Sequence, residues 1–554
     1  MQFRPYFYLA LFFISLPNLL AQNSEWTARL GSAYWDEAAD MVLLPSNNHL
    51  FVCGMVSDTI QWATNGTLAT HGSGDFWVAR YDNNGNPLWM QSGGGRVDDR
   101  FNALALAPDG NALYTAGTIR DTLVLNGDSL KTEGLYADDP LVVKYNAENG
   151  NIIWQKHWKG IGLASAEHIA SDAAGNVYVG IEFRDTLYVQ SDTLAASGSK
   201  DILLIKLNSD GTMQWYKQLG GLGADVLQAM HIDTQNRLYL GGYFQQTAIW
   251  GSHILTALGE TDIFMAQLNG NGDIVWAKRE GGEYAESITS ISSVGDNRLY
   301  WAGQFSGNTQ IDTHNLVCDG ISNSLLIASD TLGSVQWLQQ GNGAVNTANS
   351  LSTDAAGNVY MCGSFSENLY FGNQNLSANG SRVLYVVRHS YNGEAQWIKK
   401  IDVSGTSYFS DALALQTDAD GKCYIAGNYN GTLLLDNDEV PSMGFSDIML
   451  MRIAQPLVIA VNEVPLDNAS LRFTAHYLSQ QQSINLQWQS NQSETLQMQV
   501  CNLYGQIIHS QTLQGSNDMQ SISLTVGELP KGLYIATLYG KNGLKASQKL
   551  LLND

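Results

Sequence analysis

Short apolar segments alternate with polar turns along most of the chain. Runs such as FWVARY, ILLIKL, IFMAQL and IMLMRI recur, as do runs such as NVYVG, RLYLGG, RLYWAG and NVYMCG. The connectors DNNGN, NSDGT, NGNGD and DADGK are rich in Asn, Asp and Gly, which tolerate the positive φ of hairpin turns. No segment has a convincing helical period. The pattern therefore predicts short β-strands, about four in each repeating unit.

A tryptophan marks a repeat of about sixty residues, with intervals of 63, 65, 61, 61, 61 and 60. Its members are Trp26, Trp89, Trp154, Trp215, Trp276, Trp337 and Trp397. Six of them follow a Gly by four positions, and most units carry a Tyr or Phe three residues before another Gly; in the third unit Tyr178 is followed by Ile181 instead. Large aromatic residues are mostly core, so we expect these Trp to pack between neighbouring units.

A mostly acidic position precedes the repeated Trp by fourteen residues, or by fifteen in the second unit. It is occupied in chain order by Asp75, Asp139, Asp201, Asp262, Asn323 and Val383, and Asp447 opens the matching run of the last unit. Repeats of four short strands at this period are typical of β-propeller blades. The strand around Trp26 precedes any complete unit, and the last unit lacks a Trp strand, so the first strand can close the last blade and cover its edge. We predict an all-β fold with a seven-bladed β-propeller over residues 22–455.

The Gly-x-x-x-Trp and Tyr-x-x-Gly marks resemble those of a bacterial β-propeller repeat family found in exported proteins, over about residues 24–454. That resemblance implies a fold and no particular ligand. The segment YNAENGNIIW (Tyr145 to Trp154) also resembles the docking motif of quinoprotein propellers. No cofactor-binding constellation accompanies it, so we expect no cofactor.

The N-terminus has the pattern of a signal peptide over residues 1–21. Arg4 supplies the positive charge, Tyr6 to Leu20 is mostly apolar, and Ala21 offers a small residue for cleavage. No later apolar run is long enough to cross a bilayer as a helix, so we expect no membrane span in the mature protein.

The pattern changes after Pro456. Residues 456–465 read as a linker, and residues 466–554 contain alternating strands enough for a small β-sandwich. This segment resembles the C-terminal sorting domain of the type IX secretion system, although the family's usual Tyr-Pro-Asn-Pro opening is absent. The matching residues are Asn502, Leu503, Gly505, Gln506, Leu529, Pro530, Gly532, Tyr534 and Lys549. The resemblance implies handling by the type IX machinery and a place on the outer-membrane surface of a Gram-negative bacterium or outside it; the alternative is a generic sandwich with a ligand site.

The chain is strongly acidic, with 29 Lys and Arg against 52 Asp and Glu. Such a surface repels phosphate backbones and anionic lipid headgroups, which argues against nucleic-acid and membrane-surface binding. Cations and neutral partners such as glycans remain open.

The catalytic motifs that we looked for are missing: a G-x-S-x-G elbow, an H-E-x-x-H pair, a P-loop and a complete dinucleotide fingerprint. His168 and His231 fall on the expected inner strands of neighbouring blades and could approach the channel. Acidic residues recur near the starts of these strands, at Glu37, Asp40, Asp99, Glu167, Asp225, Glu286 and Asp411. If their loops share one face, they form an acidic rim at the channel mouth; otherwise they lie on unrelated solvated loops. A rim could hold Ca²⁺, meet a cationic partner or act on a sugar.

The sequence favours an exported, non-enzymatic binding or adhesion module for an extracellular glycan or protein. The alternatives are a secreted polysaccharide hydrolase or lyase that uses channel-mouth carboxylates, and a purely structural surface protein.

Overall fold

A computed structural model of the 554-residue chain forms two compact parts, Gln22–Ala454 and the residues from Gln455 onward. The structure describes residues 24–453 except 64–65, 134–136, 296, 379–381, 406–409 and 436–438, and residues 471–552 except 479–482, 491–494, 503–506, 517, 526–531 and 541–542. The expected signal peptide and linker lie outside these residues. Strands and turns, and no helix, occur in the described part, so the chain is all-β.

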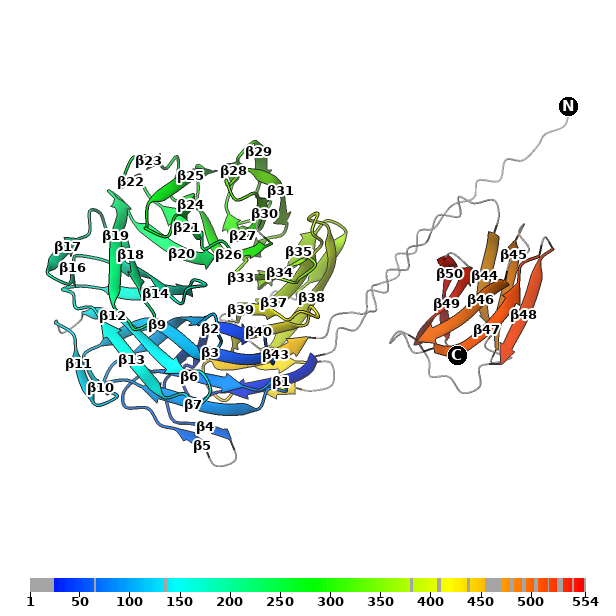
Figure 1. Cartoon of the computed structure of the whole chain (residues 1–554), viewed down its shortest axis with the longest axis horizontal. Coiled ribbons are helices and arrows are strands. Elements are labelled where there is room, and N and C mark those ends of the chain that lie inside the picture. Colours follow the sequence, from blue (N-terminus) through cyan, green and yellow to red (C-terminus); the bar gives the residue numbers. More distant parts are fainter. Residues whose placement is uncertain are drawn as a thin grey trace. The chain divides into compact units, whose positions relative to one another are not determined.

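The first part is built from seven antiparallel sheets that share one strand order, which we number in chain order (Figure 1). Sheet 1 contains β2 (Glu37–Leu44), β3 (His49–Val56), β6 (Asp75–Tyr81) and β7 (Pro87–Gly93); sheet 2 contains β8 (Arg100–Leu106), β9 (Ala112–Arg120), β12 (Asp138–Asn146) and β13 (Ile152–His157). Sheet 3 contains β14 (Ala164–Ser171), β15 (Val177–Phe183), β18 (Asp201–Leu207) and β19 (Met213–Gly221); sheet 4 contains β20 (Asp225–Ile232), β21 (Leu238–Phe244), β24 (Asp262–Leu268) and β25 (Ile274–Gly282). Sheet 5 contains β26 (Glu286–Val294), β27 (Arg298–Phe305), β30 (Asn323–Ser329) and β31 (Val335–Gly341).

Sheets 6 and 7 vary this plan. The first strand of sheet 6 is split into β32 (Val345–Asn346) and β33 (Ser350–Thr353), followed by β34 (Val359–Ser366), β37 (Val383–His389) and β38 (Ala395–Ser404). Sheet 7 contains β39 (Asp411–Thr417), β40 (Cys423–Tyr429), β43 (Asp447–Ile453) and β1 (Ser24–Leu30). Its fourth strand therefore comes from the other end of this part of the chain, with Trp26 opposite Arg452.

Between the second and third strands of each sheet the chain forms an outer hairpin. The hairpins are β4 (Ile60–Ala63) with β5 (Gly66–Leu68), β10 (Thr122–Leu125) with β11 (Asp128–Lys131), β16 (Thr186–Val189) with β17 (Asp192–Ala195), β22 (Thr247–Trp250) with β23 (His253–Thr256), β28 (Asn308–Ile311) with β29 (His314–Val317), β35 (Asn368–Phe371) with β36 (Gln374–Ser377), and β41 (Thr432–Leu434) with β42 (Glu439–Pro441). Several extend the preceding sheet, as where β22 pairs with the end of β19. These hairpins link neighbouring sheets by backbone hydrogen bonds.

The sheets surround a common centre, toward which their first strands lie (Figure 1). Each first strand contacts the next in the order β2, β8, β14, β20, β26, β33 and β39, and β39 contacts β2. The arrangement is propeller-like, and residues of all seven first strands line one central cavity, which we call the channel.

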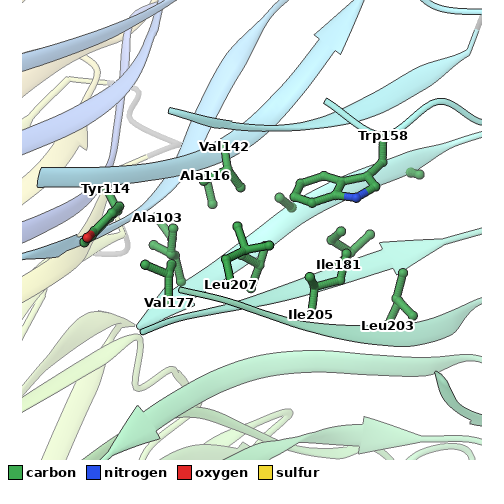
Figure 2. Close-up of a cluster of buried hydrophobic side chains, with 14 of the residues drawn as sticks. Ala103, Tyr114, Ala116, Val142, Trp158, Val177, Ile181, Leu203, Ile205 and Leu207 are labelled. Atoms are coloured by element: carbon green, nitrogen blue, oxygen red, sulfur yellow. The ribbon is translucent and has the colours of Figure 1, made fainter. Parts of the chain in front are cut away.

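Apolar side chains of adjacent sheets pack face to face. The cluster in Figure 2 joins sheets 2 and 3 and includes Tyr114 and Val142 from one and Ile181 and Ile205 from the other, all fully buried. Burying such a side chain contributes roughly 1.5–3 kcal/mol. The position of Ile181 is Gly in the other sheets, because there, as at Gly117, a Cβ would overlap a first-strand carbonyl.

The repeated Trp connects each sheet to the next. From Trp26 to Trp337 the indole Nε1–H donates to a carbonyl in the turn between the third and fourth strands of the following sheet, at Asn83, Ala147, Ser209, Gly270, Thr331 and Tyr391. The Gly of that turn has positive φ and lies against the ring, as Gly150 (φ 74°) lies against Trp89. Thus the Gly-x-x-x-Trp motif marks a contact between sheets.

The second part is a β-sandwich. Its sheets are β44 (Leu471–Leu478), β45 (Ser483–Ser490) and β48 (Gln520–Thr525), and β47 (Ile507–Gln514), β46 (Thr495–Asn502), β49 (Gly532–Gly540) and β50 (Gly543–Leu552). Buried residues from both, among them Leu486, Met498 and Ala536, form one core.

Candidate functional site: the channel mouth

Each first strand carries an irregularity at the same place. In six sheets one residue bulges out of register with the second strand, and in sheet 6 Asn349 takes this position between β32 and β33. The bulge residues are Ala39, Asn102, Glu167, Gln228, Thr289, Asn349 and Leu413. All seven line a channel cavity of about 450 Å³. A β-bulge redirects a side chain, so this repeated bulge gives the channel a ring of seven side chains.

Most polar side chains of this ring form hydrogen bonds with the backbone of the neighbouring first strand. Asn102 Nδ2 donates to the carbonyl of Ala166 (3.2 Å), Thr289 Oγ1 to Ala348 (2.6 Å), and Asn349 Nδ2 to Ala412 (3.0 Å). The next residue plays the converse role in three sheets: Asp40, Ser290 and Ser350 accept the backbone N–H of Leu104, Leu351 and Leu415. The first strand is a sheet edge with unpaired backbone groups, and these side chains satisfy them.

Two neighbouring members of the ring are left unbonded. Within the described residues, Glu167 enters no hydrogen bond, and the amide Oε1 of Gln228 is buried without a partner. Both line a second cavity of about 430 Å³, whose wall also includes bulge residues of sheets 1, 5, 6 and 7. An unsatisfied buried acceptor is costly, which makes this pair the chemically available part of the channel.

The surroundings of this pair are polar. His168 Nε2–H donates to the carbonyl of Leu227 (2.9 Å), and burial lowers the pKa of His168, so its ring is neutral at pH 7. Glu182, on β15, pairs with Lys200 (2.6 Å). Burial raises the pKa of Glu182 to about 7, although Lys200 acts in the opposite direction. The mouth therefore combines the Glu167 side chain and the Gln228 amide with a neutral His168 and the Glu182–Lys200 ion pair.

The acidic rim predicted from the sequence is wrong for three of its members. Asp99, Asp225 and Glu286 are at most 1% exposed and do not line the channel cavities. The chain turns into a first strand here, and the carboxylates face the turn; Asp99 accepts the N–H groups of Gly95 and Arg120. Buried backbone donors need acceptors, and this need places the acids inside.

The other four predicted acids separate into two pairs. Asp40 and Glu167 line the channel, and burial raises the pKa of Asp40 to about 6. Glu37 accepts the indole N–H of Trp35, and Asp411 pairs with Arg382 (2.7 Å). Neither lines a channel cavity.

The two histidines reach the channel, but they have separate partners. His168 and His231 both line the larger cavity, and His231 bonds to the hydroxyl of Ser293 (2.8 Å). In the described ranges no cluster of three or more His, Cys, Asp or Glu side chains has the geometry of a metal site.

Exposed apolar side chains that the sequence analysis does not predict lie at the edge of the sheets where the first strands begin. They lie on loops that enter first or third strands, and antiparallel pairing brings both loop types to one edge of the sheets. They are Tyr34, Ile161, Leu163, Leu222, Leu258, Tyr284, Ile321, Met443 and Phe445, each at least 43% exposed. The sequence contains a sign of two of them, because Tyr34 and Tyr284 both follow a repeated Trp by eight residues.

The sorting-motif residues of the second part come together where they are described. Asn502 on β46 lies opposite Tyr534 on β49, and Lys549 on β50 lies opposite Ile535. Gly532 begins β49, whereas Leu503, Gly505, Gln506, Leu529 and Pro530 lie outside the described residues. The three motif segments thus enter adjacent strands of one sheet.

Comparisons with known proteins bear on both parts. Residues 480–553 match the family model of the secretion system C-terminal sorting domain. An uncharacterized WD repeat-containing protein of Acanthamoeba polyphaga mimivirus is 20% identical over 504 residues; the match covers 73% of this chain and only 36% of the viral protein.

Solved structures are more distant. A Bacteroides caccae protein of unknown function is 8% identical (58% of this chain, 89% of that one, TM-score 0.31), and a Synechocystis apocarotenoid oxygenase is 10% identical (78% and 94%, TM-score 0.34). Porphyromonas gingivalis dipeptidyl peptidase 4 is 11% identical (81% and 56%, TM-score 0.31). With TM-scores this low, these structures give no information about the activity of this chain.

In the part of the chain that the structure describes, no helix is long and apolar enough to span a membrane. The sorting-domain match, together with the three motif strands of one sheet, makes this chain a secreted or cell-surface protein handled by the type IX secretion machinery.

Proposed function

We propose that this chain is an exported, non-enzymatic binding protein built on a closed seven-bladed β-propeller. Two observations support the closed ring. The first strands contact one another in an unbroken cycle, and β1 completes sheet 7 by pairing with β43. An N-terminal signal peptide would begin the export route.

The binding site is the channel mouth between sheets 3 and 4. The observation that carries this proposal is the availability of Glu167 and Gln228 in a ring whose other polar members are bonded to their neighbours. The exposed Tyr34 and Tyr284 lie on the loops of the same edge. Carboxylate and amide groups bind hydroxyls while aromatic rings cover apolar C–H faces, so an extracellular glycan is the ligand class that fits best.

The test is a glycan and matrix-protein array probed with the chain that begins at Gln22, with and without Ca²⁺. We expect reproducible glycan binding that falls at least tenfold in Glu167→Gln and in Gln228→Ala. The matched control is Glu394→Gln, an exposed acid in the turn before β38. We expect Tyr284→Ser to weaken binding as well, and Tyr370→Ser on the outer hairpin strand β35 is its matched control because both rings are similarly exposed. Absence of binding under every condition would refute the proposal in favour of a purely structural role, and equal losses in the control variants would refute the assigned site.

A second candidate function rests on Glu182. A carboxyl whose pKa is near 7 beside another carboxylate suits acid/base work on a polysaccharide. The ion pair between Glu182 and Lys200 argues against this function, because it holds the Glu182 carboxylate in another interaction. Release of reducing ends or unsaturated products from an array-positive glycan, abolished by Glu182→Gln, would replace binding by catalysis.

A further inference from the structure

Pairs of buried side chains recur where one sheet meets the next. One member begins a third strand, and the other lies at the start of the following first strand. The acid pairs are Asp75 with Asp99, Asp201 with Asp225, Asp262 with Glu286, and Asp447 with Asp36, and every member is at most 1% exposed. At the junction of sheets 5 and 6 the pair is Asn323 with Asn346.

The carboxyl groups of Asp262 and Glu286 face each other, and the backbone N–H of Asp225 bonds to the carbonyl of Lys200 (2.9 Å), which brings Asp225 beside Asp201. A Cβ on Gly281 would lie 2.8 Å from Glu286 Oε2 and 2.9 Å from Asp262 Cγ, so both carboxyl groups border one point. At the amide junction Asn346 Nδ2 lies 3.5 Å from Asn323 Oδ1, at the limit of a hydrogen bond.

The pair of Asp201 and Asp225, between sheets 3 and 4, is the least compensated. Asp201 Oδ2 accepts the N–H of Ser197 (3.0 Å) and the Nε2–H of Gln218 (2.7 Å). Within the described residues, Asp201 Oδ1 and both carboxyl oxygens of Asp225 have no partner at full hydrogen-bond geometry; the backbone N–H of Gly221 lies close enough to Asp225 to lower its pKa slightly, against the larger effect of burial. Both side chains are 0% exposed, so solvent water does not supply the missing hydrogen bonds.

Charged groups on the surrounding elements are engaged elsewhere. Lys200 pairs with Glu182 (2.6 Å), and Lys217 on β19 reaches Asp273 (3.4 Å). The other acid junctions each have a basic group: Arg279 at Asp262 (2.7 Å), His71 at Asp75 (2.9 Å) and Arg29 at Asp447 (3.9 Å). Two buried negative charges without a cation are strongly unfavourable, and one proton between them removes this cost.

From the unpartnered oxygens and the equivalent amide pair, we infer that Asp201 and Asp225 share one proton at neutral pH and that its loss in alkali weakens the junction between sheets 3 and 4. A protonated carboxyl donates to a carboxylate at the place where the Asn346 amide faces the Asn323 carbonyl. The proton thus makes an acid pair chemically equivalent to the amide pair of the same fold.

The direction of the pKa shift of Asp225 agrees with a shared proton. Burial, and secondarily the Asp201 charge, raise the pKa of Asp225 from its ordinary 3.8 to about 7. The folded chain then holds a proton that the unfolded chain releases between these values. Stability is fully present below pH 3.8, falls as pH rises through this window, and levels off above about 7.

Calorimetric melting of the chain that begins at Gln22, from pH 5 to 8.5, tests this inference. We expect the wild-type Tm to fall with pH relative to that of Asp225→Asn, with the variant about 1–3 °C the more stable at pH 8. The converse variant Asn346→Asp should add a fall with pH at the amide junction. Parallel pH profiles of wild type and Asp225→Asn would overturn the inference. So would a Tm increase with Ca²⁺ that the wild type shows and the variant lacks, because a bound cation would then replace the proton.

Infrared spectroscopy in ²H₂O keeps the inference testable if Asp225→Asn does not fold. Wild-type protein at pH 6 should show the carbonyl stretch of protonated carboxyls, to which the Asp201–Asp225 pair contributes beside Glu182, Asp99 and Glu286, and this band should disappear above pH 8. Absence of the band at pH 6 would overturn the inference without any variant.

Discussion

The indole hydrogen bonds between sheets allow a matched comparison of two tryptophans. Trp89 is 8% exposed, and its Nε1–H donates to the carbonyl of Ala147 (3.1 Å). Trp397 is 6% exposed, and within the described residues its Nε1 has no partner. The reason is topological: β43 ends at Ile453 and its neighbour β1 begins at Ser24, so no hairpin turn supplies the carbonyl found elsewhere.

We expect Trp89→Phe to destabilise the propeller and Trp397→Phe to be much less costly. Both variants lose similar apolar area, so the difference between them reports the hydrogen bond. Trp89 loses about 1 kcal/mol for the bond itself, since Arg80 still donates to the Ala147 carbonyl (3.1 Å). Trp397→Phe instead removes a buried N–H that has no acceptor, and this offsets about 1–3 kcal/mol of the stability lost with the packing. The variants should therefore differ by roughly 2–4 kcal/mol.

Urea unfolding and calorimetry of the chain that begins at Gln22 provide the measurement. An unfolding entropy of about 2.1 cal/mol/K per residue, taken over a single cooperative body as large as Gln22–Ala454, converts 1 kcal/mol into roughly 1 °C. The two variants should thus differ by about 2–4 °C, with unchanged m-values. Equal destabilisation by both substitutions would refute the reasoning, because the repeated Trp would then act by packing alone.

Three other properties can be tested in the same way. Gly150→Ala should cost about 2–4 kcal/mol, because φ is 74° and the new Cβ would lie 2.8 Å from the Trp89 ring, whereas Gly251→Ala, with φ 62° and open space around it, should cost about 1 kcal/mol; equal losses in urea unfolding would contradict this. His389→Phe should stabilise the chain by about 2 kcal/mol more at pH 5 than at pH 8, since His389 is fully buried, its ring nitrogens have no hydrogen-bond partner among the described residues, and burial lowers its pKa from 6.5 to about 3. Below pH 6.5 the unfolded chain binds a proton on His389 that the native chain does not bind, so the stability of the wild type falls as pH falls. A difference in Tm between the two proteins that does not change with pH would contradict this prediction. Ser290→Ala should cost about 1 kcal/mol in urea unfolding because it removes the acceptor of the Leu351 N–H (3.1 Å), and no change would indicate that water replaces it.

The repeat was readable from the sequence because one contact imposes it. Trp89 must meet the turn of the next sheet, so its spacing from Trp154 equals one structural unit. The bulge was not readable, since a one-residue register shift leaves composition unchanged and only reverses which side chains face the channel. The sequence therefore places Asp225 and Glu167 in one predicted rim, although the structure separates them. Asp225 follows its Trp by ten residues and is buried in the turn, whereas Glu167 follows its Trp by thirteen and sits on the bulge.

Departures from the repeat are the better guide to function in such a scaffold. A residue that recurs along the repeat is explained by the contact that recurs with it: the indole bond forms in six sheets, and the bulge bond forms in three, through Asn102, Thr289 and Asn349. Glu167 and Gln228 occupy the same bulge without that bond, in adjacent sheets. The third sheet also departs at the Tyr-x-x-Gly position. Because the two polar exceptions lie in adjacent sheets, a ligand held by them would bind off the channel axis, and substitutions on the opposite wall should leave its affinity unchanged.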